Sequence, residues 1–264
     1  LDAYNNLGNV LADLGIVDQA VAAFQIVLEL DHEHPNAAHM AAALSGQTTV
    51  AAPPAYVREL FDAHAEIYDS YILDQLGYNA PVAIRKLLED LAHGKTLSFE
   101  AGLDLGCGTG LTAQAFEGLV SGWAGVDLSP NMIAVAKEKK LYDQLHAADM
   151  TEYLDGALDG ADMNRDRFDL VVAGDVFTYT GDLDPLFEGV RRNISGDGLF
   201  AFTTERAAGG GYVLAPTGRY GHDDSYIRNL AAFRNFEIVA HGVRTIRIED
   251  GVPVIGSVFV LKPC

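Results

Sequence analysis

Leu103–Thr112, which reads LDLGCGTGLT, is the stretch of sequence that decides the fold. An apolar run from Ala101 to Leu105 leads into three glycines at alternate positions, and an apolar helical pattern follows to about Leu119. Strand, tight turn and helix in this order predict the first unit of a doubly wound α/β domain. Glycine adopts backbone angles closed to other residues and lets a ligand approach the main chain. The turn therefore predicts a nucleotide-like ligand.

The acidic end of the next strand supports this prediction. Residues Trp123 to Val126 form the expected strand, and the Asp127 that follows offers a carboxylate to both hydroxyls of a ribose. A dinucleotide-binding turn reads G-x-G-x-x-G and would place its third glycine at position 111, which is Leu111. The glycines fall at positions 106, 108 and 110 instead, which argues against a dehydrogenase.

Two motifs carry a resemblance to a known family. Asp104 to Gly110 resembles motif I of the class I S-adenosylmethionine-dependent methyltransferases, and Gly125 to Ser129 resembles the acidic-loop motif of the same superfamily. The resemblance implies a doubly wound, Rossmann-like sheet of seven strands, mostly parallel with one antiparallel strand. It also implies S-adenosylmethionine as cofactor. The residues to which it assigns cofactor binding in the α/β core are Asp104, Gly106, Cys107, Gly108, Asp127, Leu128, Met132, Asp149, Met150, Gly174 and Asp175.

Asp149 has two interpretations. It follows the third expected strand, near Gln144 to Ala148. The resemblance implies that its carboxylate accepts from the adenine amino group, while the backbone N–H of Met150 meets a ring nitrogen. The alternative is an ordinary helix cap for the residues from Thr151 onward.

Composition excludes several classes of partner. The 264 residues include 37 acidic and 18 basic side chains, a net charge of −19, and such a surface repels nucleic acid. The two cysteines, Cys107 and Cys264, make no disulfide framework, which fits a reducing cytoplasm. We find no membrane-spanning run and no signal peptide, and we expect a cytoplasmic protein without membrane contact. The histidines at 32, 34 and 39 lack a suitable carboxylate or thiol cluster, so we expect no metal.

Residues 1–46 read as a helical segment. Gly8 and Ala20 provide the small side chains needed where two helices cross closely, and Phe24 fills the space beside them. These offsets resemble one tetratricopeptide repeat. One repeat cannot bury its own apolar face, so we expect either preceding repeats or docking onto the catalytic domain. The segment is acidic and without Lys or Arg, which fits either a protein-binding surface or a plain solvated face.

The remaining chain divides into a linker and one domain. Residues 47–55 are a linker by composition, and 56–264 form the expected methyltransferase domain, with a helical lead-in at 56–95 and the α/β core at 96–264. We expect residues 1–46 to be dispensable for cofactor binding. The lead-in, with its phrases Phe61-Asp62 and Tyr68-Asp69, resembles that of bacterial methyltransferases that carry tetratricopeptide repeats. The resemblance implies a lid in which Tyr68 or Tyr71 hydrogen-bonds the methionine end of the cofactor. Core packing is the alternative.

The stretch Glu205 to Arg228 is predicted to form a mobile, glycine-rich cover over the acceptor. It contains Arg219 and Tyr220, which we assign to substrate binding together with Arg247. The two arginines are expected to orient an anionic acceptor. The alternative is a solvated loop in which Arg219 pairs with Asp223 or Asp224.

His222 is the predicted general base, because its ordinary pKa suits proton transfer near neutrality. The competing interpretation is that it caps a helix beginning near Asp223. Tyr179 and Tyr226 are the other catalytic candidates. The predicted activity is methyl transfer to a small-molecule or peptidic acceptor. The alternatives are a protein methyltransferase recruited through the helical segment and a non-catalytic cofactor-binding scaffold; the acceptor atom is left open.

Overall fold

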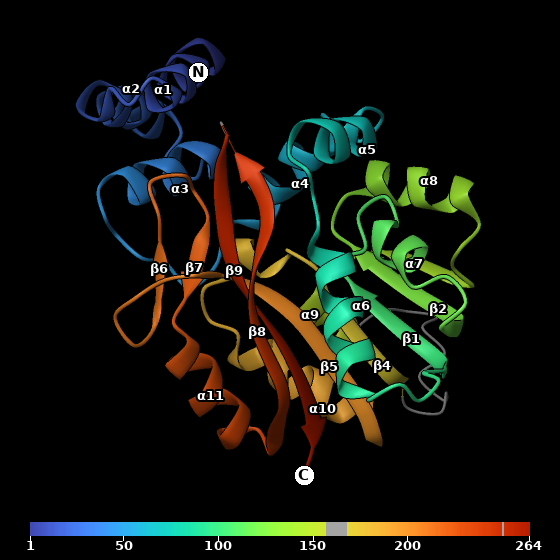
Figure 1. The fold of residues 1–264 in the computed structure, drawn as a ribbon. Helices are drawn as coiled ribbons and strands as arrows, with labels where there is room; N and C mark the ends of the chain where they lie inside the picture. Colours follow the sequence, from blue (N-terminus) through green and yellow to red (C-terminus); the bar gives the residue numbers. More distant parts are fainter. Residues whose placement is uncertain (157–167, 250) are drawn as a thin grey trace.

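A mixed sheet lies at the centre of the molecule (Figure 1). The structure is a computed structural model that describes residues 1–156, 168–249 and 251–264. Over these residues the sheet has nine strands, in the order β3-β2-β1-β4-β5-β7-β6, with β9 antiparallel to β5 and β8 antiparallel to β9. The strands are β1 (Phe99–Leu105), β2 (Val120–Asp127), β3 (Gln144–Ala147), β4 (Phe168–Ala173), β5 (Ile194–Arg206), β6 (Tyr212–Leu214), β7 (Tyr220–His222), β8 (Phe236–Glu249) and β9 (Val252–Pro263).

The predicted count of seven strands is wrong by one hairpin. Strands β1 to β5, β8 and β9 are the expected seven, and five of them run parallel. Strands β6 and β7 arise from the stretch that was predicted to be a mobile cover. β7 extends the sheet beyond the end of β4, because Gly221 and His222 pair with Glu205 and Arg206 of β5. The pairing satisfies backbone groups that a loop would leave to water.

Helices cover both faces of the sheet, as in a doubly wound fold. Adjacent residues of β4 face opposite sides: Val171 packs in one core cluster and Val172 in the other. The first cluster includes side chains of α9 (Met150–Leu154), α10 (Asp184–Asn193) and α11 (Asp224–Phe233), and the second includes those of α6 (Ala80–Leu91) and α7 (Leu111–Ala115). In the described part of the chain, no helix is long and apolar enough to span a membrane.

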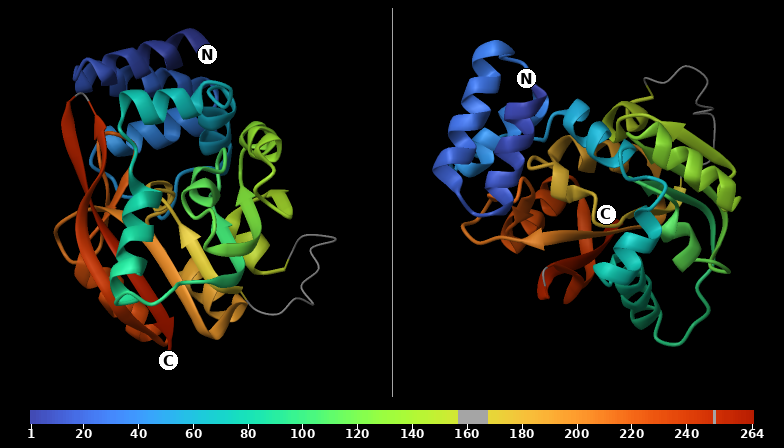
Figure 2. Two further views of the ribbon diagram at one scale, coloured as in Figure 1. Left: turned by 45° about the vertical axis from the view of Figure 1, so that its right-hand side comes forward. Right: turned by 90° about the horizontal axis from the view of Figure 1, so that it is seen from above.

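The lead-in lies over the end of the sheet that carries the glycine turn (Figures 1 and 2). It consists of α4 (Pro54–Asp62), α5 (Tyr68–Ser70) and a π-helical turn, η1 (Tyr71–Gln75), before α6. Asp62 fixes it to the start of α8 (Pro130–Lys139), because its Oδ1 accepts from the Ser129 hydroxyl at 2.5 Å and from the Asn131 N–H at 3.1 Å. Asp69 adds an ion pair with Lys139 at 2.5 Å.

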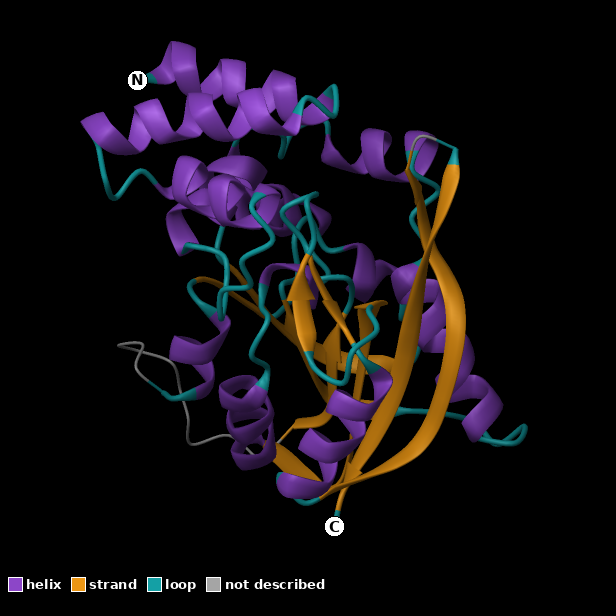
Figure 3. Ribbon diagram, turned by 90° about the vertical axis from the view of Figure 1, so that its left-hand side faces the viewer, coloured by secondary structure: helices purple, strands orange, loops and turns teal. Residues whose placement is uncertain are grey.

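The N-terminal segment contains α1 (Asp2–Asp13), α2 (Val17–Leu30) and α3 (Pro35–Leu44), which lie together at one end of the molecule (Figure 3). A Cβ built on Gly8 would lie 2.6 Å from Phe24 Cε1, so the close crossing of α1 and α2 requires glycine there. The segment docks onto the β6–β7 hairpin, where His39 Nε2 lies 2.8 Å from the Gly218 carbonyl oxygen. The tetratricopeptide character of these helices stays a prediction.

Residues 47–53, which we call the strap, run along the larger domain in extended form. The Val50 carbonyl accepts from the N–H groups of Gly181 and Asp182 at 2.9 and 2.8 Å, and the Ala52 N–H donates to the Tyr179 carbonyl at 3.0 Å. Thr49 Oγ1 lies 2.5 Å from the Tyr220 hydroxyl. Three residues of the strap are thus paired with four residues of the hairpin and loop beneath it, so the predicted linker is part of the packed structure.

Candidate functional site

The glycine turn after β1 has backbone angles that other residues adopt only with strain. Gly106 has φ +68°, and a Cβ there would lie 2.3 Å from Val176 Cγ2. Gly110 has φ +96°. The neighbouring strand holds the turn in place: the Gly108 N–H donates to Asp127 Oδ2 at 2.8 Å. The turn is therefore pressed against the loop that follows β4 and anchored on β2, which leaves its outer face open to a ligand.

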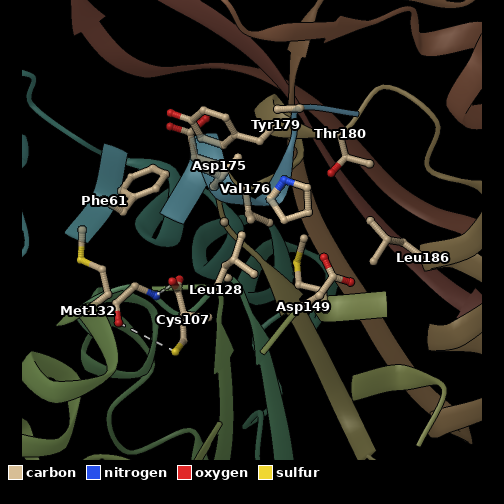
Figure 4. A pocket seen from close by; sticks show the side chains of 18 of the residues that line it. Phe61, Cys107, Leu128, Met132, Asp149, Asp175, Val176, Tyr179, Thr180 and Leu186 are labelled. Atoms are coloured by element: carbon tan, nitrogen blue, oxygen red, sulfur yellow. Dashed lines mark hydrogen bonds between the residues drawn. The ribbon is translucent and has the colours of Figure 1, made fainter. Parts of the chain in front are cut away.

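A cavity of about 430 Å³, the first cavity, opens at this turn (Figure 4). Its size lies within the range of small-molecule and cofactor sites. In Figure 4, Asp175 and Tyr179 lie on one side of it, with Asp149 and Cys107 on the other. The predicted cofactor-binding residues that line it are Tyr68, Gly106, Cys107, Gly108, Asp127, Leu128, Met132, Asp149, Met150, Gly174 and Asp175.

Two carboxylates of this cavity are held by backbone donors. Asp127 accepts through Oδ1 from the Ser129 N–H and through Oδ2 from the Gly108 N–H, both at 2.8 Å. Burial outweighs these bonds and raises the pKa of Asp127. Asp149 caps α9, because its Oδ1 accepts from the N–H groups of Thr151 at 2.7 Å and Glu152 at 3.3 Å. Both interpretations of Asp149 are thus compatible: Oδ1 caps the helix while the side chain faces the cavity.

Two predicted cofactor residues lie elsewhere. Asp104 is fully buried behind the turn, where the Tyr142 hydroxyl donates to its Oδ2 at 2.6 Å. Burial raises the pKa of Asp104 to about 7. Tyr71 is 53% exposed and lines a neighbouring cavity, so of the two tyrosine candidates only Tyr68 reaches the first cavity.

Some lining residues were not predicted from the sequence. Tyr78 lines the first cavity, and its hydroxyl donates to the Gly174 carbonyl at 3.2 Å. Its place in the lead-in phrase Leu76-Gly77-Tyr78 was a signal for it. The strap contributes Val50 and Ala52 to the wall, for which the sequence carried no signal.

A second cavity of about 670 Å³ adjoins the first. It lies between the lead-in and the far end of the β8–β9 hairpin, which extends beyond the rest of the sheet (Figure 3). The lead-in and β8 meet through two backbone bonds, from the Asn79 N–H to the Ile246 carbonyl at 2.8 Å and from the Ile248 N–H to the Leu76 carbonyl at 2.6 Å. Side chains that line both cavities are Phe61, Tyr68, Asp175 and Tyr179.

The charged wall of the second cavity is an ion network centred on Arg247. The Arg247 guanidinium donates to Asp175 at 2.6 and 2.8 Å, to Glu249 Oε1 at 2.7 Å and to Glu205. Arg219 lies beside it and pairs with Glu205 and Glu249. Both arginines line the cavity, and their assignment to substrate binding stays a prediction. Arg219 does not pair with Asp223 or Asp224, which were the predicted alternative partners.

The prediction that His222 faces the cleft is wrong. His222 lies in β7, is fully buried, lines neither cavity, and its Nε2 lies 3.0 Å from the Gly181 carbonyl oxygen. Burial lowers its pKa to about 4. It is not the helix cap either, because the side chain of Asp223 accepts from the Ser225 N–H at the start of α11.

The other assigned residues of this region have separate positions. The Tyr226 hydroxyl accepts from the Leu183 N–H at 2.9 Å and lies 3.3 Å from Asp182 Oδ1, away from both cavities. Tyr220 is fully buried and bonded to the strap, so its predicted contact with the acceptor is wrong. Tyr179 is the one catalytic candidate of the three that lines the cavities. Over the described residues, no group of three or more His, Cys, Asp or Glu side chains is arranged to hold a metal ion.

Comparison with known sequences supports a methyltransferase domain. Residues 103–202 match the family described as "Methyltransferase domain". A ubiquinone biosynthesis O-methyltransferase of Bradyrhizobium diazoefficiens is 29% identical over 144 residues, which cover 54% of this chain. The match covers 55% of the relative, so the chain spans about half the length of the curated relative it matches.

Solved structures share the fold at low sequence identity. A magnesium protoporphyrin IX methyltransferase from Synechocystis PCC 6803 with bound SAM has a TM-score of 0.58 and 16% identity, over 80% of this chain and 97% of that one. The N-methyltransferase NodS from Bradyrhizobium japonicum, in complex with S-adenosyl-L-homocysteine, has a TM-score of 0.59 and 15% identity, over 78% and 98%. Residues 103–202 thus match a methyltransferase domain, and the solved structures share the fold of the described chain.

Proposed function

We propose that this protein transfers the methyl group of S-adenosylmethionine to a small-molecule acceptor bound in the second cavity. The observation that carries the proposal is the wall shared by the two cavities, formed by Phe61, Tyr68, Asp175 and Tyr179. A ligand in each cavity would meet at this wall, which is the arrangement that in-line transfer between two bound molecules requires. The curated relative is by its name an O-methyltransferase of ubiquinone biosynthesis, which is also small-molecule chemistry.

The residues of the first cavity fit the cofactor. When bound, S-adenosylmethionine supplies a methyl group on a positively charged sulfonium. Asp127 offers a carboxylate for the ribose hydroxyls and Asp149 Oδ2 one for the adenine amino group, since only its Oδ1 is engaged by the backbone. The glycine turn leaves room for the methionine part against the main chain.

The aromatic residues of the shared wall would exclude water and position the acceptor. Burial raises the pKa of Tyr179 and of Tyr68, so both hydroxyls stay protonated. They are suited to donating a hydrogen bond rather than to removing a proton. Asp175 lines both cavities, and its carboxylate is the group of this wall that is suited to accept a proton.

A cavity-filling variant tests where the acceptor binds. Ile67 lines the second cavity only and is 59% exposed, so Ile67→Trp narrows that cavity without disturbing the core. We expect unchanged affinity for S-adenosylhomocysteine by calorimetry. Methyl transfer to a mixture of small metabolites, followed by mass spectrometry, should fall at least tenfold. The matched control is Val82→Trp, which is similarly exposed at 55% and lines neither cavity.

Two results would reject the proposal. If the protein does not bind S-adenosylhomocysteine, the first cavity is not a cofactor site. An Ile67→Trp variant that transfers methyl groups at the rate of the Val82→Trp control would move the acceptor out of the second cavity. Methylation of a protein partner recruited through residues 1–46, the other predicted activity, would give that second result.

A further inference from the structure

The second cavity has two chemically distinct walls. One comes from the lead-in and is mostly apolar; it includes Leu60, Ile67, Ile72 and Leu76, together with His64, Tyr68 and Tyr71. The other is the ion network of β8 and the residues beside it. A molecule that contacts both walls of the second cavity must carry an apolar body and a polar head. The head lies toward the wall shared with the first cavity, where Asp175 is part of the network.

The network has more negative than positive charge. Three carboxylates, those of Asp175, Glu205 and Glu249, face two guanidinium groups, those of Arg219 and Arg247. All three carboxylates have at least one oxygen within 3.0 Å of a guanidinium nitrogen. One negative charge is therefore left over, and further carboxylates on the chain, with its net charge of −19, add to the same sign.

The arginines of this wall are already engaged. Each of the three guanidinium nitrogens of Arg247 has a carboxylate partner, and its side chain is only 5% exposed. Two nitrogens of Arg219 lie against Glu205 and Glu249. An anionic head group would have to compete with these carboxylates, so the expectation that the two arginines orient an anionic acceptor does not fit the observed partners.

We propose that the acceptor is a primary or secondary amine on an apolar body, bound in the second cavity as its ammonium ion, with the Asp175 carboxylate as the proton acceptor. The proposal rests on the methyl transfer proposed above and adds the class of acceptor. The surplus negative charge attracts the ammonium group. The ring faces of Phe61, Tyr68 and Tyr179 favour a cation beside them.

The position of Asp175 fits this role. It follows β4 at the wall common to both cavities, and its φ of +56° is a conformation that residues other than glycine adopt only with strain. Its N–H donates to Thr203 Oγ1 at 2.8 Å, which together with Arg247 fixes the carboxylate. Strain held at such a place by surrounding contacts is typical of functional sites.

The reaction balances with no further reactant. The ammonium group gives one proton to the Asp175 carboxylate and becomes a neutral amine. Its nitrogen lone pair then forms the new N–C bond, while the bond from that methyl carbon to sulfur breaks and its electron pair stays on the sulfur. The products are a methylated ammonium ion and S-adenosylhomocysteine, and Asp175 later releases its proton to water.

Burial raises the pKa of Asp175 to about 6, against the opposing charge of Arg247. The group is therefore mostly ionised at neutral pH and a stronger base than an exposed carboxylate. The charged and titratable groups that act on it are Arg247, Glu205 and Arg219, and it lies near the buried hydroxyls of Tyr68, Tyr78 and Tyr179.

Three probes with one apolar body separate the classes of acceptor: 4-phenylbutylamine, 4-phenylbutanol and 4-phenylbutyrate. Calorimetry in the presence of saturating S-adenosylhomocysteine measures their binding without turnover. We expect the amine to bind about tenfold more tightly than the alcohol, and the carboxylate more weakly than both. Glu249→Gln should reduce the ratio of amine to alcohol affinity severalfold. Asp197→Asn, which removes the same charge at a side chain 99% exposed and outside the cavity, should leave the ratio unchanged.

Turnover tests the proton acceptor. Mass spectrometry should detect N-methylation of the amine probe, and Asp175→Asn should lower its rate by roughly 10²-fold or more. Equal or tighter binding of the carboxylate, or no binding of the amine, would overturn the amine proposal, and so would normal turnover in Asp175→Asn. If S-adenosylhomocysteine itself binds in these experiments, such a result leaves the cofactor site standing. If it does not bind to the unmodified protein, the proposed function fails instead.

Discussion

Replacing Asp127 by asparagine should damage the protein in two measurable ways. In the structure both carboxylate oxygens accept a backbone N–H, one from Gly108 and one from Ser129, each at 2.8 Å. An amide has one oxygen and one NH₂ group, so one of the two N–H groups would face a donor. Because hydrogen bonds to a charged acceptor contribute about 1.5–3 kcal/mol, we expect the free energy of unfolding to fall by about 1–3 kcal/mol.

The same substitution should weaken binding of the cofactor. The Gly108 N–H belongs to the turn that borders the first cavity, so its loss disturbs the turn as well as the ribose contact. Losing one charged hydrogen bond corresponds to a decrease in affinity of roughly 10- to 100-fold. Calorimetric titration with S-adenosylhomocysteine measures the affinity, and urea unfolding without ligand measures the stability.

Asp149→Asn is the matched control. There both backbone bonds, from Thr151 and Glu152, go to Oδ1, so the amide can keep its oxygen on the helix and turn its NH₂ toward the cavity. Stability should then change by less than about 0.5 kcal/mol. Affinity should still fall, because the NH₂ would face the amino group of adenine. The reasoning is refuted if Asp127→Asn has the stability and the affinity of the unmodified protein, or if the two variants lose equal stability.

Three further outcomes follow from contacts described above. Burial lowers the pKa of His222 from an ordinary 6.5 to about 4. Between these two pH values the imidazole is protonated in the unfolded chain but not in the folded one, so the free energy of unfolding falls as the pH falls from 6.5 to 4. Urea unfolding at pH 7 and pH 4.5 should show about 2 kcal/mol less acid destabilisation in His222→Gln, with unchanged cofactor affinity; an altered affinity would put the residue in the site. Gly106→Ala, whose Cβ would meet Val176, should lower cofactor affinity at least tenfold by calorimetry, and an unaffected variant would show that the turn adjusts. Deleting residues 1–46 removes the anchor of the strap and should weaken cofactor binding severalfold in the same assay, whereas equal affinity would make those residues dispensable, as the sequence indicated.

The features that local sequence predicted are those that local physics determines. The glycines at 106, 108 and 110 adopt positive φ angles, and short apolar runs mark the strands; both signals are read from neighbouring residues. The strands near 101–105, 123–126 and 144–148 were found in this way. The Asp250-Gly251 dipeptide is typical of the turn of a two-stranded hairpin, but Asp250 lies outside the described residues. Most of the cofactor assignments followed from the same motifs.

The errors concern contacts between distant parts of the chain. The residues around His222 have the composition of a catalytic loop. Pairing of β7 with β5 nevertheless buries the His222 side chain against Gly181, 41 residues away in the sequence. Arg219 pairs with Glu205 and Glu249. β-strands lie between these residues in the sequence, and the sequence pattern did not place those strands side by side. No periodicity within the strap indicates that Val50 pairs with residues 181 and 182.

The attachment of the helical segment limits which parts of the chain can be exchanged independently of one another. His39 meets Gly218, Thr49 meets Tyr220, and the strap between the helices and the domain also forms part of the wall of the first cavity. Replacing residues 1–46 alone would take away the His39 imidazole, which contacts both Gly218 and the ring of Tyr220. The N-terminal helices and the β6–β7 hairpin therefore form one packing unit, although they lie far apart in the sequence.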